Sequence, residues 1–237
     1  MIGKQRIILA LAIAGLLSAC VTSGAKISQD AEAALIQRQN SAVTVEKLTF
    51  HPLKTGDVLP LELGAADPVL LVDNEYAFVK AFALPQWNGS YMIKVASFRV
   101  GSPIDPAILY PTVVFLDEAF KETRRSSPQQ FVYRREGLNT GDGLHATFFF
   151  NEANRGDRYL ILASRRQLPE GNTRLSGYTV NMTPITVPVG AGAVTWVVPT
   201  SAANHNTPMA ASASGRVSLE VQAYQPIRIE PAGKSGQ

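Results

Sequence analysis

The residues of this chain best suited to metal binding or general base catalysis are three histidines, His51, His145 and His205. They lie far apart in the sequence, and none has a second histidine or a carboxylate at the spacing of a metal-binding motif. The neighbouring carboxylates Asp117 and Glu118 could serve glycoside hydrolysis only if both faced one site. Adjacent residues of a strand point to opposite faces, so this pair cannot form such a site alone. We expect no metal site and no cofactor.

Serine chemistry has equally little support in the sequence. A hydrolase elbow needs a motif such as Gly-x-Ser-x-Gly, and the nearest segment, Ala211–Gly215, lies among small residues without a strand or helix pattern. The glycines Gly190 and Gly192 follow Pro188, and no helix pattern opens after them, so they do not form a phosphate-binding loop. These observations predict a protein that is not an enzyme and has no catalytic residues.

Trp87 is the best candidate for ligand binding. It lies in the loop sequence Gln86-Trp87-Asn88-Gly89, where planar amides flank a large aromatic ring. An aromatic platform with a few placed polar groups is what a saccharide site requires. The alternative is structural: Trp87 would then plug one end of the fold. The sequence leaves both interpretations open.

The charge balance excludes one class of partner. The chain has 22 basic and 19 acidic residues, and removal of an N-terminal leader that contains Lys4 and Arg6 would leave 20 against 19. A nucleic-acid-binding domain would show a basic stripe, so we expect no nucleic-acid partner. Arginines do occur in pairs, at 124–125, 134–135 and 165–166. Solvated strand ends or a site for an anionic partner would both explain these pairs.

The N-terminus predicts export and a membrane anchor. Lys4 and Arg6 precede the apolar run Ile7–Leu17, which is too short to span a bilayer that needs about 20 residues. The run ends in Leu17-Ser18-Ala19-Cys20, which resembles the lipobox of bacterial lipoproteins. The resemblance implies removal of residues 1–19 and attachment of lipid, including palmitate, to Cys20. An ordinary cleaved signal peptide with an unmodified cysteine is the alternative.

The residue after Cys20 bears on the compartment. In enterobacterial lipoproteins an aspartate there favours the inner membrane, and this chain has Val21 instead. The resemblance therefore implies a lipid-anchored protein of the cell envelope on the periplasmic face of the outer membrane.

The rest of the chain predicts an all-β protein. Residues 21–28 are small and polar and are expected to form a tether, followed by a short helix from Asp30 to Gln39 capped by Ser28. From Ala42 onward, short apolar or alternating runs are separated by Gly, Pro, Asn and Asp. About ten such runs, with no room for crossover helices, predict an antiparallel β-sandwich.

These patterns give the expected domain organisation. Residues 1–19 form the signal peptide, 20–41 the tether and short helix, and 42–198 the β-sandwich. Residues 199–237 are expected to form a flexible loop, a terminal hairpin and a tail. Asp117 is expected to stabilise a turn after its strand. The predicted sandwich core consists of Phe78, Phe82, Tyr91, Phe98, Phe115, Phe120 and Tyr159.

The central region carries a series of motifs in a characteristic order. They are Phe78–Pro85, Tyr91–Ser97, Tyr110–Phe120, Phe131–Tyr133 and Arg158–Ala163. This series resembles the maltose operon periplasmic protein family over residues 45–170. The resemblance implies a non-enzymatic, periplasm-facing, β-rich protein accessory to carbohydrate uptake. Its partners would be the membrane, through the lipid anchor, and a saccharide or envelope transport proteins. The alternative is a protein-interaction or assembly module of the envelope that uses a strand edge or the 199–215 segment.

Overall fold

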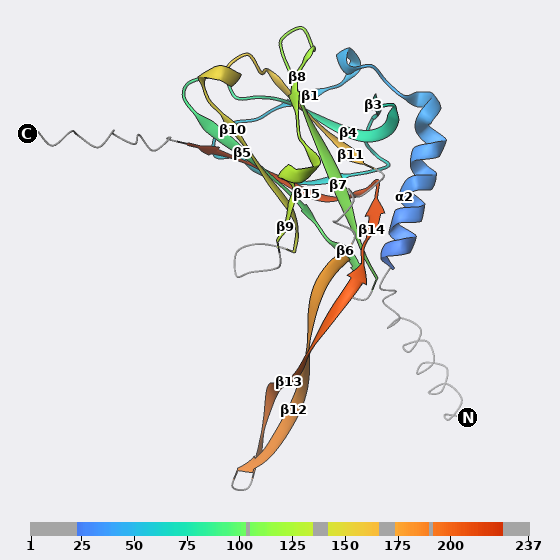
Figure 1. Ribbon diagram of the computed structural model, residues 1–237, viewed down its shortest axis with the longest axis vertical. Helices are drawn as coiled ribbons and strands as arrows, with labels where there is room; N and C mark the ends of the chain where they lie inside the picture. The colour runs from blue at the N-terminus through green and yellow to red at the C-terminus, as the bar shows by residue number, and fades with distance from the viewer. Residues whose placement is uncertain (1–22, 103–104, 135–141, 166–173, 190–191, 225–237) are drawn as a thin grey trace, which may run out of the picture.

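The computed structural model describes residues 23–102, 105–134, 142–165, 174–189 and 192–224, and for residues 174–208 it describes the backbone alone. Within these residues, one α-helix, α2 (Gly24–Arg38), precedes strands joined by turns and loops (Figure 1). Short 3₁₀ turns lie at Gln39–Ser41, Val45–Lys47, Pro128–Gln130 and Glu152–Asn154. The predicted signal peptide, Cys20 and the C-terminal tail lie outside the described residues.

The strands form two packed sheets and one separate ribbon. The first sheet contains β1 (Phe50–Pro52), β3 (Val69–Val72), β4 (Glu75–Ala83), β6 (Val100–Ser102), β7 (Asp105–Leu116), β8 (Glu122–Arg125), β11 (Tyr159–Arg165) and β14 (Ala210–Ser212). The second contains β2 (Val58–Leu63), β5 (Tyr91–Phe98), β9 (Val132–Arg134), β10 (Gly143–Phe150) and β15 (Gly215–Ala223). The ribbon is β12 (Arg174–Val189) with β13 (Gly192–Pro208).

The two packed sheets confirm the predicted all-β sandwich. Their order is β1-β4-β11-β7-β14 along the first sheet and β2-β15-β5-β10-β9 along the second. The described pairings are antiparallel except for two short ones, β1 with β4 and β14 with β7. Among the short strands, β3 and β9 lie where apolar runs of the sequence predict strands, whereas β6, β8 and β14 have an apolar pattern too brief to recognise in the sequence.

Alternation along the strands fills the space between the sheets. On β4, Phe78 and Phe82 belong to the main core, and Ala77, Val79 and Ala81 belong to a second cluster that residues 43–50 cover. Tyr91 and Phe115 are also buried in the main core, as predicted.

Three of the predicted core aromatics lie elsewhere. Phe120 and Tyr159 are half-buried and pack against the second cluster. Phe98 alternates with the buried Ile93 and Val95 along β5, so it lies on the outer face of the second sheet. Its prediction as a sandwich core residue was therefore wrong.

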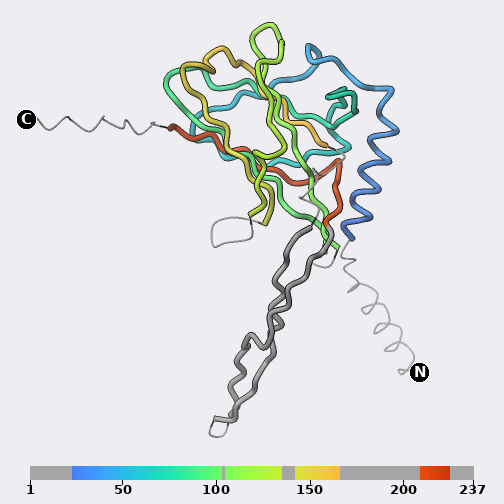
Figure 2. The backbone as a smooth tube through the Cα atoms, in the orientation of Figure 1, coloured from blue at the N-terminus to red at the C-terminus, as the bar shows by residue number. Residues whose placement is uncertain are grey.

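The helix begins earlier than the sequence predicted. Ser23, not Ser28, is its N-cap and accepts a hydrogen bond from the Lys26 backbone N–H at 3.1 Å. The first helical residue, Gly24, lies so close to β7 that a Cβ there would be 2.5 Å from the Asp105 carbonyl oxygen. The predicted tether over 21–28 is thus mostly helix, which lies along one side of the sandwich (Figure 2).

The segment after residue 198 differs most from the prediction. Instead of a loop from 199, β13 continues to Pro208 and pairs with β12, with one register shift between Asn181 and Met182, and Ala210–Ser212 pairs with β7. Backbone groups make these pairs, so small polar residues without an apolar pattern can take part. β15 then lies between β2 and β5, which places residues 215–223 inside the sandwich.

The fit of Gly24 against β7 gives a stability prediction. Gly24→Ala should lower the free energy of unfolding by about 1–3 kcal/mol, because the added methyl group meets backbone atoms that cannot move aside independently. Gly156→Ala is the matched control, since nothing lies within 4 Å of its Cβ position, and it should change stability by less than about 0.5 kcal/mol. Urea denaturation followed by circular dichroism measures both; equal effects would contradict the close docking of α2.

Candidate functional site

The candidate site lies at the end of the sandwich where β5 begins and β10 ends. Five aromatic residues gather there from three segments of the chain. They are Trp87, Tyr91, Phe149, Phe150 and Tyr224, and we call this surface the aromatic end.

The loop that carries Trp87 is fixed at both sides. The Leu84 N–H donates to the Arg158 carbonyl at 2.8 Å, and the Ser90 carbonyl accepts from the Tyr224 N–H at 3.0 Å. Gly89 has a φ of +135°, a conformation that glycine adopts easily, and the chain bends there before β5 begins. Trp87 is half-buried, packs against the main core, and lies 6.3 Å from Tyr91 between ring centroids. It therefore contributes to the core, as the structural interpretation required, and keeps part of its surface exposed.

Beneath Trp87 the aromatic rings form a stack between the sheets. Tyr91 and Phe150 are directly paired in the β5–β10 register, and their rings lie 4.4 Å apart and nearly parallel. Phe150 in turn meets Phe115 edge-on at 5.4 Å. Offset and edge-on contacts of this kind stabilise aromatic clusters beyond their buried area. Burial, together with the charge of Asp157, raises the pKa of Tyr91, so its hydroxyl stays protonated.

An ion pair, Arg124 with Asp157, lies against this aromatic stack. The guanidinium of Arg124 lies 4.2 Å from the ring centre of Phe115 and 4.5 Å from that of Phe150. Its Nε atom donates to the Asp157 Oδ2 atom at 2.8 Å, and the Thr123 hydroxyl donates to Asp157 Oδ1 at 2.6 Å. Arg124 Nη2 is buried and has no acceptor among the described residues. Asp157 therefore compensates a cation that is held against two aromatic faces.

A second aromatic pair lies on the outer side of the same end. Phe149 follows the opposite face of β10 from Phe150, is 49% exposed, and its ring centre is 5.1 Å from that of Tyr224. The Arg124 guanidinium also approaches the Phe149 carbonyl at 3.5 Å. The inner aromatic Phe150 and the outer aromatic Phe149 are therefore neighbours on β10, and Arg124 contacts both residues.

The other residues predicted to do chemistry lie away from this end or are already engaged. Asp117 stabilises its turn as predicted: its Oδ1 atom accepts from the N–H groups of Ala119 and Lys121, both at 2.9 Å. His51 is exposed beside β4, and His145 contacts Phe98 on the outer face of β10. In the part of the chain that the structure describes with side chains, no group of three or more His, Cys, Asp and Glu residues is placed to hold a metal ion.

The one arginine pair of which both members are described, Arg124 and Arg125, is neutralised by carboxylates. Arg125 contacts Asp73 and Glu122, and Arg124 is held by Asp157. Arg134 and Arg165 lie on β9 and β11, and their neighbours Arg135 and Arg166 are outside the described residues. None of the helices in the described residues is long and apolar enough to cross a bilayer.

Sequence reasoning missed a groove at the open side of the sandwich. It has a volume of about 750 Å³ and lies between α2, β2 and the 64–67 loop. Lys80 contacts Asp67 there, and Asp67 also accepts from the Gly64 N–H at 2.9 Å. The Arg38 guanidinium at the end of α2 holds the same loop through the Asp67 carbonyl at 2.7 Å. No local motif links these residues, because the loop, helix and strand meet only in the folded chain.

Together, the fold and this site define an all-β sandwich protein with an aromatic cluster at one end, buried at Tyr91 and Phe150 and partly exposed at Trp87, Phe149 and Tyr224. Residues 74–179 match the model of the family described as maltose operon periplasmic protein precursor (MalM), which confirms the resemblance predicted for the central region. The matched residues include β4, β5, β7, β8, β10 and β11, and with them every residue of the aromatic end except Tyr224. No curated protein and no solved structure matches the chain.

The buried ion pair makes the second prediction. Asp157→Ala should destabilise the protein by about 3 kcal/mol, because it leaves the Arg124 charge against two aromatic rings without a counter-charge. Glu122→Ala removes a carboxylate from an exposed pair on the same strand and should cost less than about 1 kcal/mol. Chemical denaturation compares the two variants. Similar losses for both would show that Asp157 is not the compensating charge.

Proposed function

We propose that this protein is a non-enzymatic, lipid-anchored protein of the cell envelope that faces the periplasm and binds a saccharide for a carbohydrate-uptake system. The observation that carries this proposal is Trp87, half-exposed at the aromatic end and inside the region that matches the maltose operon family. The family's description supplies the compartment and the link to sugar.

The chemistry of the aromatic end suits a sugar ring. Trp87 presents part of a flat apolar surface, and the exposed side chains of Gln86 and Asn88 beside it can donate and accept hydrogen bonds. Apolar contact with a few oriented polar groups is how small-molecule sites combine affinity with specificity. The outer pair, Phe149 and Tyr224, offers a further apolar surface at the same end of the sandwich.

The environments of Asp157 and Asp117 favour saccharide binding over saccharide hydrolysis at this end. Asp157 is 7% exposed, and both of its oxygens accept bonds, from Thr123 and Arg124. Asp117 is engaged by backbone N–H groups of its own turn. Neither is placed to donate a proton to a glycosidic oxygen.

The groove beside α2 is a weaker candidate for the same ligand. Its size is appropriate for a small molecule, but the described residues that line it include no aromatic side chain. Its Lys80–Asp67 pair leaves a polar wall without a platform for a sugar face. The aromatic end is therefore the site we assign.

Docking of another protein on the β2 edge has less support. The edge strand β2 carries Pro60 in its middle, and proline has no N–H to offer a further strand. Envelope transport proteins as partners thus stay an alternative that the aromatic end does not require.

The membrane anchor is Cys20, through the lipobox-like sequence that precedes it. Acyl chains contribute about 0.8 kcal/mol per buried methylene, and two or more chains hold a protein stably on a bilayer. We place the anchored protein on the periplasmic face of the outer membrane, because Val21 replaces the aspartate that favours the inner membrane.

Saccharide binding predicts a change at Trp87. In protein that carries Trp196→Phe, so that Trp87 is the remaining tryptophan, titration with maltodextrins at millimolar concentration should shift the emission in a saturable way. By calorimetry, Trp87→Ala should weaken binding about tenfold or more, since it removes the stacking surface. Phe98→Ala, an aromatic change at the other end of β5, is the control and should bind normally. Absence of both heat and emission change would overturn the saccharide assignment.

Lipid attachment is tested separately. Mass spectrometry of the protein extracted from membranes of the producing bacterium should find an N-terminal peptide that begins at Cys20 and carries acyl chains on its thiol and its amino group. Cys20→Ser should yield no acylated peptide. An unmodified thiol on a mature protein cut elsewhere would refute the anchor.

A further inference from the structure

The β12–β13 hairpin is unusual in length and isolation. Its strands run 16 and 17 residues, which at about 3.3 Å per residue makes a ribbon about 50 Å long. Within the described residues the two strands form a sheet of their own, and Figure 1 shows the ribbon leading away from the sandwich. A lone two-stranded ribbon is marginally stable in water, so this one is expected to have a surface to dock on.

The distal half of the hairpin has an uncharged, largely apolar sequence, which is unfavourable for a ribbon exposed to water on both faces. No Asp, Glu, Lys or Arg occurs between Arg174 and Arg216, in a chain of which 17% is charged. Exposed strands of soluble proteins normally carry charges, lysine above all, that discourage association. Here the segment nearest the turn, residues 184–198, consists of valine, isoleucine, alanine, glycine, proline, threonine and one tryptophan.

The strand register separates these residues into two faces. Ile185 is paired with Trp196, Val187 with Val194, and Val189 with Gly192. Paired residues share a face and neighbours alternate, so these positions lie together on one apolar face. Thr186 paired with Thr195 lies on the other face, between Pro184 paired with Val197 and Pro188 paired with Ala193, so that face carries the polar pair.

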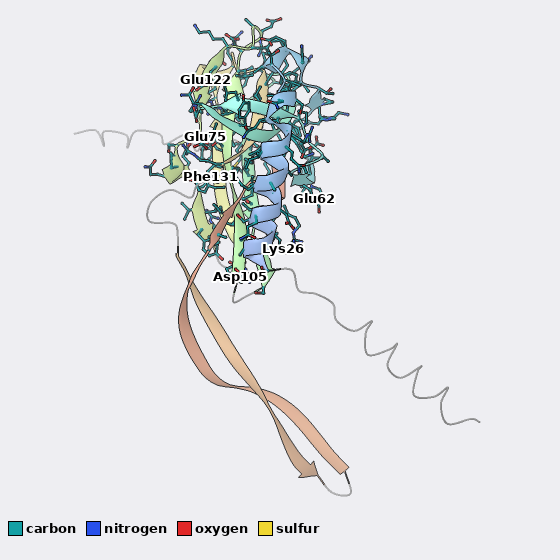
Figure 3. All side chains as sticks on the ribbon, turned by 90° about the vertical axis from the view of Figure 1, so that its right-hand side faces the viewer. Lys26, Glu62, Glu75, Asp105, Glu122 and Phe131 are labelled. Atoms are coloured by element: carbon teal, nitrogen blue, oxygen red, sulfur yellow. The ribbon has the colours of Figure 1, made fainter. Side chains whose placement is uncertain are left out.

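The hairpin leaves the sandwich beside the start of α2. Ala210, two residues after the end of β13, is paired with Ala107, and Gly24 packs against the backbone of the same stretch of β7. The Ala25 N–H donates to Asp105 Oδ2 at 3.3 Å. Lys26 and Asp105 accordingly lie at the end from which the ribbon emerges, and Glu122 lies at the opposite end (Figure 3). We call the end with Gly24 and Asp105 the base.

The length of chain before α2 limits how far the base can be from a membrane. Only residues 21–23 separate Cys20 from the helix, and four residue steps span at most about 14 Å. This step rests on the lipid anchor proposed above. If Cys20 is lipidated, the bilayer lies closer to the base than the hairpin is long, so a ribbon that points from the base must lie along or enter the bilayer.

We propose that the distal half of the β12–β13 hairpin docks on the phospholipid bilayer through the face shared by Ile185, Val187 and Trp196. The prolines at 184 and 188 cannot donate hydrogen bonds, so the β12 edge is poorly suited to accept a further protein strand. The free backbone groups of a two-stranded ribbon need water or headgroups, which confines it to the interfacial region. Docking there covers the apolar face and leaves the threonine face and the strand edges toward headgroups and water.

The experiment uses the mature chain with Cys20→Ser, which removes the lipid contribution. This protein should float with vesicles of phosphatidylethanolamine and phosphatidylglycerol. Val187→Glu should reduce the floated fraction about tenfold, because it puts a charge on the apolar face. Thr186→Glu is the matched control one residue away on the other face and should change flotation by less than about twofold. In a Trp87→Phe background, lipids brominated in the upper acyl chain should quench Trp196 emission.

Three results would contradict bilayer docking, and a folding control accompanies them. Failure of the Cys20→Ser protein to float, or equal flotation of the two glutamate variants, would overturn it. A dimer by ultracentrifugation that Val187→Glu dissociates, without flotation of the parent protein, would assign the face to a second copy of the chain. Flotation is independent of acylation, so failure of the lipid anchor and failure of hairpin docking are distinguished. An unchanged melting temperature of the sandwich would show that the variants still fold.

Discussion

The sandwich depends on large aromatic side chains buried between its two sheets. One cation, Arg124, lies among them and is neutralised by Asp157. Strands β7 and β10 contribute Phe115 and Phe150 to the space between the sheets, and Arg124 lies against both rings. Such a cation is tolerated only because Asp157 supplies the opposite charge from the turn before β11. The pair therefore connects β8, the β10–β11 turn and the aromatic stack, and the loop of Trp87 rests on that assembly through Tyr91.

Much of the sandwich could be predicted because its central strands are long and alternate. The runs around Tyr76–Leu84, Tyr91–Phe98 and Leu144–Phe150 correspond to β4, β5 and β10. Core aromatics were placed correctly on strands that are buried on both faces, as at Phe78 on β4 and Phe115 on β7. Phe98 was misplaced because alternation gives two faces and does not say which one is covered.

The remaining features could not be predicted, since they depend on contacts between distant segments. Helix α2 begins at Gly24, where Ser23 caps it and Gly24 packs against the backbone of β7, and the second of these contacts cannot be read from the sequence. Asp157 lies 33 residues from Arg124, and no local pattern links them. The ribbon beyond residue 198 lacks an apolar alternation and is held by backbone pairing with β12. Trp87 was found because its loop is locally distinctive, whereas Phe149 and Tyr224 meet only through the fold.

The strand registers give the molecule a direction that bears on its proposed role. β7 starts at the base beside Gly24 and ends at Leu116, which pairs with Tyr159 next to the turn that carries Asp157. β5 runs in the opposite direction, from the aromatic end to the base. Tyr91 lies at the aromatic end, and Phe98 leads into β6, which pairs with the first residues of β7. The aromatic end and the base are therefore separated by the full length of a 12-residue strand, about 40 Å. If lipid and hairpin hold the membrane at the base, as we propose, Trp87 at the aromatic end would face away from it, toward the compartment through which a saccharide would diffuse.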